Sequence, residues 1–185
     1  MDSINKQQPE DNFKNLEGTE AWAKAKEIAE SAKTCFFCSG IKNGLPFSTR
    51  PMSFQKIDDN GDFWFLSAND SKKNADIQSD PMVQLLFQAS PHSGFLTLYG
   101  IAEISTDKAK IDELWEPIIK TWFTEGKDDP RITVIKVSPT QGYYWDNKHG
   151  DAIAFIKMAA GAVLGKTFDD SIEGKLEAEE GSAVN

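Results

Sequence analysis

A serine followed by two lysines is the part of this chain best suited to bind an anion. Ser71, Lys72 and Lys73 come shortly after an alternating aromatic segment at 62–67. Ser71, or the aspartate before it, can cap a helix over about 72–79, and two positive charges in the first turn oppose the helix dipole. Because N–H groups at a helix start attract anions, a bound phosphate would turn both lysines into partners. A capped surface helix with solvated lysines is an equally good interpretation of these residues alone.

Arg50 would add a second kind of phosphate-binding group. It lies in a predicted strand over 46–54, which a turn at 58–61 joins to the aromatic strand. A guanidinium on this strand could converge with the helix start and bind two phosphate oxygens at once. The alternative is that Arg50 forms a surface ion pair, which would contribute little stability.

Two cysteines, Cys35 and Cys38, are spaced as in a redox or metal motif. They lie in an aromatic segment that is typical of a strand, where residues three apart point to opposite faces. No second cysteine pair or histidine cluster completes a zinc site. We therefore expect buried structural thiols and no metal.

The composition limits the possible function classes. The length of 185 residues suits one domain with a substantial core. The formal net charge of −9 argues against general nucleic-acid binding. No basic segment with an apolar run follows Met1, and the longest apolar stretch, 152–164, contains Lys157 and is too short to span a bilayer. We therefore expect a cytoplasmic protein without membrane contact.

Four regions differ in their residue pattern. Residues 1–18 are polar and unpatterned, so we expect a flexible arm. Residues 19–150 carry the patterned segments and form the predicted domain, which begins with a helix. Residues 151–166 are alanine-rich and predict a C-terminal helix, whereas 167–185 are acidic and predict a disordered tail.

Hydrophobic periodicity predicts two longer helices and a series of short strands. The helices cover 20–33 and 107–123, and Pro117 must kink or break the second. The predicted strands are 35–39, 46–54, 62–67, 82–89, 95–105 and 132–137, followed after Pro139 by an extended segment at 141–146. Because turn residues favour hairpins between neighbours, we expect a mainly β fold: a six-stranded antiparallel barrel with flanking helices.

The order of these landmarks resembles the FMN-binding split barrel of the pyridoxamine-phosphate oxidase superfamily, most closely its general stress protein branch. The resemblance covers about 32–146. It rests on the following segments, in order: Arg50-Pro-Met-Ser53, Phe63-Trp-Phe-Leu-Ser67, Ser71-Lys72-Lys73, Asp80-Pro81 and Tyr143-Tyr144-Trp145-Asp146. It implies a split β-barrel, bound FMN, with FAD as the alternative, and a homodimer with the flavin at the subunit interface.

The resemblance also implies a set of flavin-binding residues. The FMN phosphate would be held by Arg50, Ser71, Lys72 and Lys73. The ring edge would lie along the backbone of Pro51, Met52 and Ser53, and the ring and ribityl chain would be flanked by Leu66 and Ser67. The second subunit would contribute Trp145, and Trp122 or Phe123.

Other positions depart from the enzymes that oxidise pyridoxamine phosphate. Gln55 stands in place of a lysine, and 146–151 lacks their Arg-x-His. We therefore expect a flavin-binding general stress protein without that activity, which acts as a flavin-dependent oxidoreductase on an unknown substrate. The alternatives are a non-catalytic flavin carrier, or a haem or deazaflavin binder on the same barrel; no catalytic residue is indicated.

Overall fold

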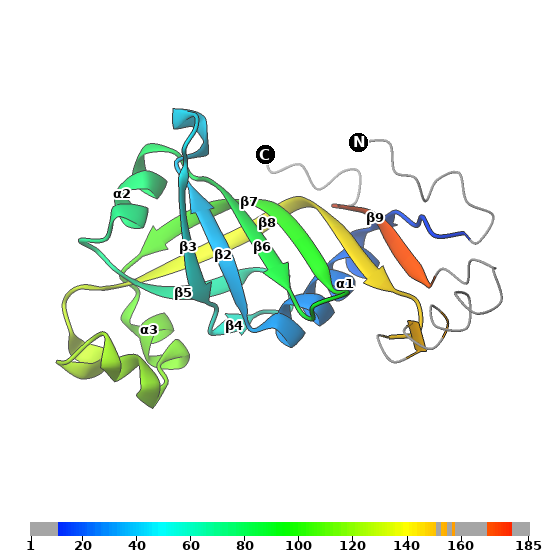
Figure 1. Cartoon of the computed structure of the whole chain (residues 1–185). Helices are drawn as coiled ribbons and strands as arrows, with labels where there is room; N and C mark the ends of the chain where they lie inside the picture. The colour runs from blue at the N-terminus through cyan, green and yellow to red at the C-terminus, as the bar shows by residue number, and fades with distance from the viewer. Residues whose placement is uncertain (1–10, 151–152, 155–156, 158–169, 179–185) are drawn as a thin grey trace. The chain divides into compact units, whose positions relative to one another are not determined.

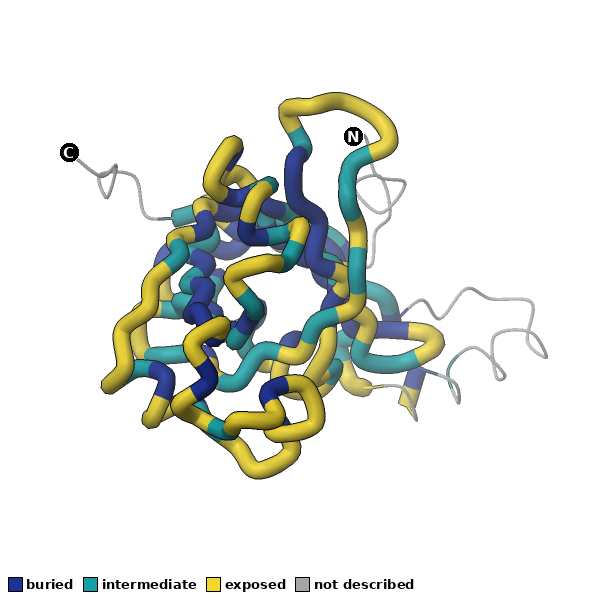
Figure 2. Tube along the Cα trace, turned by 90° about the vertical axis from the view of Figure 1, so that its left-hand side faces the viewer, coloured by how far each residue is buried: buried dark blue, intermediate teal, exposed yellow. Residues whose placement is uncertain are grey.

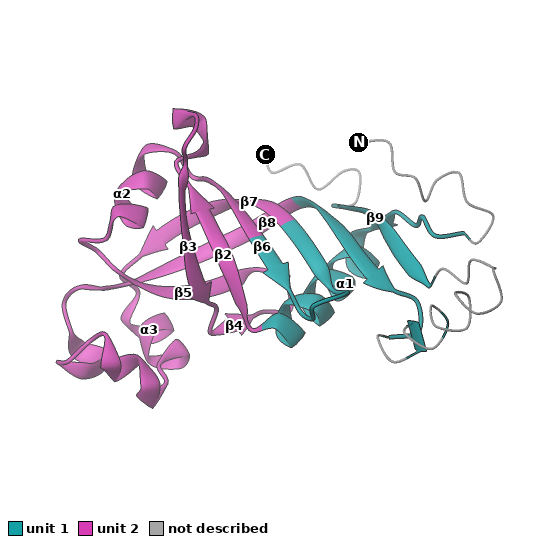
Figure 3. Ribbon diagram, viewed as in Figure 1, with its two compact units in different colours: residues 1–32, 86–97, 141–185 teal, residues 33–85, 98–140 magenta. Residues whose placement is uncertain are grey.

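The computed structural model describes residues 11–150, 153–154, 157 and 170–178. The chain divides into two compact units, which are coloured separately in Figure 3 and labelled by element in Figure 1. The first unit comprises Met1–Ala32, Leu86–Thr97 and Gln141–Asn185, and the second comprises Lys33–Leu85 and Leu98–Thr140. Both units draw residues from the long strands β6 (Met82–Gln88), β7 (Phe95–Ser105) and β8 (Ile132–Asn147).

The second unit is built mainly from strands. β2 (Thr34–Ser39) pairs antiparallel with β3 (Ser48–Ser53), and the strand order continues from β2 through β6 and β7 to β8. β5 (Phe63–Ala68) pairs antiparallel with β8 and with the short β4 (Lys56–Ile57). Among the described strands this path does not return to its start, so the sheet is open. The prediction of a mainly β fold with flanking helices is confirmed.

The burial pattern of β5 explains the alternation of residue types in its sequence. The side chains of Phe63, Phe65 and Ser67 are buried, whereas those between them are only partly buried. Phe65 packs edge-to-face on Phe37 of β2, with ring centroids 5.4 Å apart. Alternating burial fixes the register, because a slip by one residue would exchange the two faces. Figure 2 colours the chain by burial and shows the exposed connection between β2 and β3.

The predicted helix over 107–123 is broken in two. α3 spans Lys108–Leu114, and a 3₁₀ turn, η3, spans Pro117–Thr121. Proline cannot donate a backbone hydrogen bond and disfavours helical geometry in the residue before it, which ends α3 before Pro117. Both pieces still contribute to one buried cluster, made of Ile111, Leu114, Ile119, Phe123, Ile132 and Val134.

The first unit contains α1 (Gly18–Ala32) and a small mixed sheet. β9 (Ser171–Glu177) pairs antiparallel with residues 141–147 of β8 and parallel with β1 (Leu16–Glu17). β9 lies within the segment predicted to be a disordered tail, and β1 lies within the predicted flexible arm. Both predictions are therefore wrong for these residues, because each segment completes the other's backbone hydrogen bonds. The sheet is mixed rather than purely antiparallel, and it includes strands beyond the six expected.

β8 also differs from its prediction, since it is one strand and not two segments separated by Pro139. β5 pairs with residues 132–137 and β9 with residues 141–147, so Pro139 lies between the two pairings. A proline is tolerated at such a position because it removes no hydrogen bond from either ladder. The predicted helix at 151–166 lies largely outside the described residues, although Ile153, Ala154 and Lys157 are helical.

The cysteines behave as structural residues. Cys35 and Cys38 are both buried free thiols, as predicted. Burial raises the pKa of Cys35 to about 12, and the neighbouring Cys38 adds to this effect. Such a thiol stays protonated and is a poor nucleophile or metal ligand. Within the described residues no helix has the length and apolar character needed to cross a membrane.

Candidate functional site

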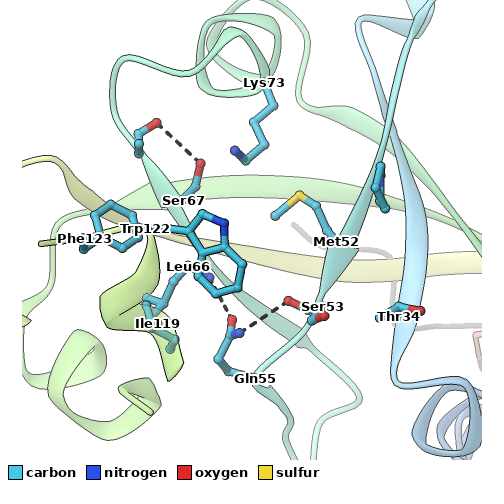
Figure 4. Close-up of a pocket in the computed structure, with 12 residues that line it drawn as sticks. Thr34, Met52, Ser53, Gln55, Leu66, Ser67, Lys73, Ile119, Trp122 and Phe123 are labelled. Carbon is cyan, nitrogen blue, oxygen red and sulfur yellow. Dashed lines mark hydrogen bonds between the residues drawn. The ribbon is translucent and has the colours of Figure 1, made fainter. Parts of the chain in front are cut away.

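The second unit contains a cavity of about 460 Å³ that opens beside the edge strand β3 (Figure 4). It is bounded by the end of β3, by the second half of β5, by the first turn of α2 (Lys72–Ser79) and by η3 with the two residues that follow it. Its lining residues are Thr34, Pro51, Met52, Ser53, Gln55, Leu66, Ser67, Ala68, Lys73, Ile119, Trp122 and Phe123. Most of this surface is apolar, which is typical of a small-molecule site.

Gln55 connects the two strands that form the floor of the cavity. Its side-chain Oε1 accepts a hydrogen bond from the Leu66 N–H at 2.9 Å, and its Nε2 donates to the Ser53 carbonyl oxygen at 3.4 Å. Figure 4 shows both bonds. The sequence singled out Gln55 only as a departure from an enzyme pattern, and an isolated glutamine gives no signal for this bridging role. Thr34, Ala68 and Ile119 were not predicted as site residues either.

A buried asparagine organises the polar side of the cavity. The Oδ1 atom of Asn74 accepts hydrogen bonds from the hydroxyls of Ser67 at 2.7 Å and Ser71 at 3.1 Å. Its Nδ2 donates to Thr133 Oγ1 of β8 at 2.8 Å. Ser71 is the N-cap of α2 and also accepts from the Asn74 N–H. Asn74 thus holds the helix start against β5 and β8.

Replacing Asn74 with alanine is expected to lower the free energy of unfolding by about 2–3 kcal/mol, since the buried hydroxyls of Ser67 and Thr133 would lose a partner. Urea denaturation followed by tryptophan fluorescence would measure the loss. Gln78→Ala is the matched control, because Gln78 is exposed on the same helix. A loss of equal size in both variants would contradict a special role for Asn74.

Lys73 is the one charged side chain among the described residues that line the cavity. It is only partly exposed, and its ammonium group extends toward Met52 and Trp122 (Figure 4). Burial lowers the pKa of Lys73 and the positive charge of Arg50 lowers it further, while Asp70 acts in the opposite direction. No carboxylate of the described residues forms an ion pair with Lys73 within 4 Å. The cavity therefore contains a cation that is well placed to receive an anion.

The other predicted phosphate ligands are arranged differently. Lys72 is exposed and does not line the cavity. Arg50 also does not line it, because its guanidinium donates a hydrogen bond to Ser39 Oγ at 3.2 Å and lies 3.5 Å from Asp76 Oδ2. Arg50 thus forms an ion pair in this structure, but the pair is mostly buried and is not the surface pair of the alternative interpretation. Ser71 uses its hydroxyl as a helix cap.

Some of the aromatic residues predicted near the flavin ring line the cavity, and another does not. Trp122 follows η3, lines the cavity and is 66% exposed, and Phe123 is buried beside it. Both therefore line the cavity of their own chain, whereas the resemblance implied that they would reach the flavin from a second subunit. Trp145 belongs to the first unit, where its ring contacts that of Tyr143 at a centroid distance of 4.6 Å. The cavity is therefore lined by eight of the twelve predicted residues, namely Pro51, Met52, Ser53, Leu66, Ser67, Lys73, Trp122 and Phe123.

This geometry defines what the cavity can bind. Its walls are apolar and partly aromatic, β3 offers backbone groups at a sheet edge, and Lys73 supplies a positive charge. The N–H groups of Lys72 and Lys73, at the first two positions of α2, have no acceptor within the helix. A flat apolar ring system with an anionic tail matches this combination of groups.

Comparisons with known proteins identify the family of this chain. The family model described as "Pyridoxamine 5'-phosphate oxidase like" matches residues 20–169. The chain belongs to this family. A curated relative, protein bli-3 of Neurospora crassa, is 26% identical over 113 residues, which are 57% of this chain and 54% of the relative. The alignment thus spans about half the length of that relative.

Solved structures of general stress proteins share the fold. A protein from Jannaschia sp. CCS1 described as general stress protein 26 superposes with a TM-score of 0.71 at 23% identity, covering 85% of this chain and 98% of that one. The general stress FMN/FAD binding protein of Xanthomonas citri superposes with a TM-score of 0.56 at 24% identity, covering 65% and 84%. At these identities the likeness concerns the fold, and the predicted split-barrel class is confirmed.

Proposed function

We propose that this member of the family is a general stress protein that binds a flavin nucleotide in the cavity of the second unit. The ring system would lie between the backbone of Pro51–Ser53 and the side of β5 formed by Leu66 and Ala68, with Trp122 at the outer edge. The phosphate would bind at the start of α2 and to Lys73. The observation that carries the proposal is the partly buried ammonium group of Lys73 in an otherwise uncharged cavity.

Several properties of the cavity support a flavin. Its volume of about 460 Å³ falls in the range of ordinary small-molecule sites. The solved neighbour from Xanthomonas citri is itself an FMN/FAD binding protein. No histidine lines the cavity among the described residues, which favours a flavin over haem, whose iron needs an axial ligand.

A bound flavin would supply the redox chemistry, and the protein would orient the ring and set the charge around it. Lys73 is the one titratable side chain among the described lining residues, so the site offers no carboxylate, imidazole or thiol as a general base. We infer an oxidoreductase that transfers electrons or hydride without a protein base. The carrier alternative predicts binding without turnover.

We also propose a homodimer in which a second copy of the chain covers the open side of the cavity. Four large apolar side chains of the second unit are more than half exposed, namely Phe36, Leu45, Ile118 and Trp122. Such residues are frequent in protein interfaces. We still expect Trp145 of the second copy to reach the flavin. Light scattering on the purified protein would determine its mass in solution.

A parallel titration with riboflavin, FMN and FAD tests the proposal. FMN is expected to bind more tightly than riboflavin, because only FMN carries the phosphate, and binding would quench flavin fluorescence. Protein that is colourless and quenches none of the three would exclude a flavin site. If FMN binds but neither NADH nor NADPH bleaches it under anaerobic conditions, the carrier function replaces the oxidoreductase.

A further inference from the structure

A polar cluster lies behind the anion-binding end of the cavity and connects α2 to the β2–β3 pair. The carboxylate of Asp76 accepts a hydrogen bond from Ser39 Oγ at 2.9 Å, and Ser39 Oγ in turn accepts from Arg50 Nη1 at 3.2 Å. Arg50 Nη2 is 3.5 Å from Asp76 Oδ2, so the three side chains form a closed triangle. The side chains of Arg50 and Asp76 are only 23% and 13% exposed.

Asp76 is held in its charged form. Burial by itself raises the pKa of this carboxyl group. Hydrogen bonds from Ser39 and Ser48, the charge of Lys72 and the bond from Arg50 more than offset that effect, and the pKa lies below its usual range. The negative charge therefore persists at neutral pH.

This ion pair has two consequences for the neighbouring cavity. First, the Arg50 guanidinium is directed to Ser39 and Asp76 and does not line the cavity. Second, the negative charge of Asp76 offsets the positive charge of Arg50. Arg50 is close enough to Lys73 to lower the pKa of that lysine. Lys73 then remains as the cation without an ion-pair partner among the described residues at this end of the cavity. Arg50 thus lies beside the proposed phosphate site, and its contacts with Ser39 and Asp76 restrain its side chain.

We propose that Asp76 determines the phosphate specificity of the flavin site by restraining and neutralising Arg50. This inference rests on the proposed function. The phosphate of FMN is close to a dianion at neutral pH, whereas each phosphate of FAD carries one charge and riboflavin has none. A site with one free cation gains less from the FMN dianion than a site with two, because Arg50 could otherwise bind two of its oxygens. Asp76 thus keeps the preference for FMN over FAD and riboflavin below the value that two free cations would give.

The test is the replacement Asp76→Asn, which keeps the shape of the side chain and removes its charge. FMN is expected to bind about 5- to 20-fold more tightly, within the usual range of coupling between neighbouring sites. FAD should gain less than FMN, and riboflavin should be unchanged. Fluorescence quenching by each flavin gives the three dissociation constants. Riboflavin affinity also reports whether the cavity is intact, and Asp76→Ser is a second uncharged variant if Asp76→Asn folds poorly.

A double-mutant cycle with Arg50→Ala separates restraint of Arg50 from a general charge effect. If Asp76 acts through Arg50, the FMN gain of Asp76→Asn should fall to less than half in the Arg50→Ala background. An equal gain in both backgrounds would overturn the inference. Asp80→Asn is the matched control, since Asp80 is also a buried acid of this region but pairs with Lys42. It should leave the ratio of FMN to riboflavin affinity unchanged.

The outcomes also distinguish this inference from the function on which it rests. A wild-type protein that binds no flavin, or binds FMN and riboflavin equally, overturns the proposed function and the role of Asp76 together. A wild-type protein that prefers FMN by a ratio that Asp76→Asn leaves unchanged or lowers overturns the role of Asp76 alone.

Discussion

Replacing Lys73 with alanine is expected to weaken FMN binding about 10- to 100-fold, because a charge-assisted hydrogen bond to phosphate contributes about 1.5–3 kcal/mol. Riboflavin lacks the phosphate and should bind the variant as it binds the wild type. Lys73 is the charged residue among the described ones that line the cavity, so its loss removes the principal electrostatic attraction for the anion. Fluorescence titration with both flavins measures the effect.

Lys72 provides the control for this prediction on the same helix turn. It has the same charge, but it is exposed and does not line the cavity. Lys72→Ala should therefore change FMN affinity by less than about 3-fold, as expected for a solvated charge. Equal losses of FMN and riboflavin in Lys73→Ala, or equal effects of the two lysine variants on FMN, would mean that Lys73 does not contact the phosphate.

The lowered pKa of Lys73 also predicts that FMN affinity depends on pH. Burial and the nearby Arg50 lower this pKa from its ordinary value of 10.5, and only the protonated amine attracts a phosphate. FMN affinity should be fully present below the lowered pKa and should decrease as the pH rises through it. The Lys73→Ala variant should lack this decrease, which separates it from titration of the flavin itself.

Replacing Gly174 with alanine is expected to destabilise the first unit by more than about 3 kcal/mol, at the upper end of the cost of overpacking. A Cβ atom on Gly174 would lie 1.8 Å from the Lys14 carbonyl oxygen and 2.4 Å from its carbon. Both are backbone atoms, so no side chain can rotate away. The Lys14 carbonyl also accepts a hydrogen bond from the Tyr144 hydroxyl at 2.9 Å, and moving it would break that bond.

Lys175 is the matched control, because it is the next residue of β9 and its side chain is exposed. Lys175→Ala should change the free energy of unfolding by no more than about 0.5 kcal/mol. Thermal unfolding by circular dichroism compares the variants, and amide hydrogen exchange of residues 12–17 would locate the loss. If Gly174→Ala unfolds at the wild-type temperature and protects these amides equally, β9 is not packed against the N-terminal segment as described.

Much of the fold follows from local patterns that a single sequence carries. The predicted bounds 72–79 and 95–105 agree with α2 and β7, because a cap residue, a proline and strict alternation mark their ends. Pro117 was expected to kink or break its helix, and it does break it. Such signals act over a few residues and need no knowledge of distant neighbours.

Errors occur where long-range pairing overrides local composition. The acidic composition of 167–185 predicts disorder, yet residues 171–177 form β9. Its backbone is paired with β8 on one side and with β1 on the other. The glycine at 174 permits this close approach, but nothing in the neighbouring residues indicates which strand it meets.

Local patterns in the sequence were enough to predict the strand-rich class of this protein, the helix start at Ser71 and the cations beside it, because alternation, capping and charge are local properties. Which of these cations lines the cavity depends on the folded structure. Lys73 enters it, Lys72 remains in solvent, and Arg50 is held by Ser39 and Asp76. Residue type gives the charge of a side chain, whereas its direction depends on partners that folding brings from other strands and helices.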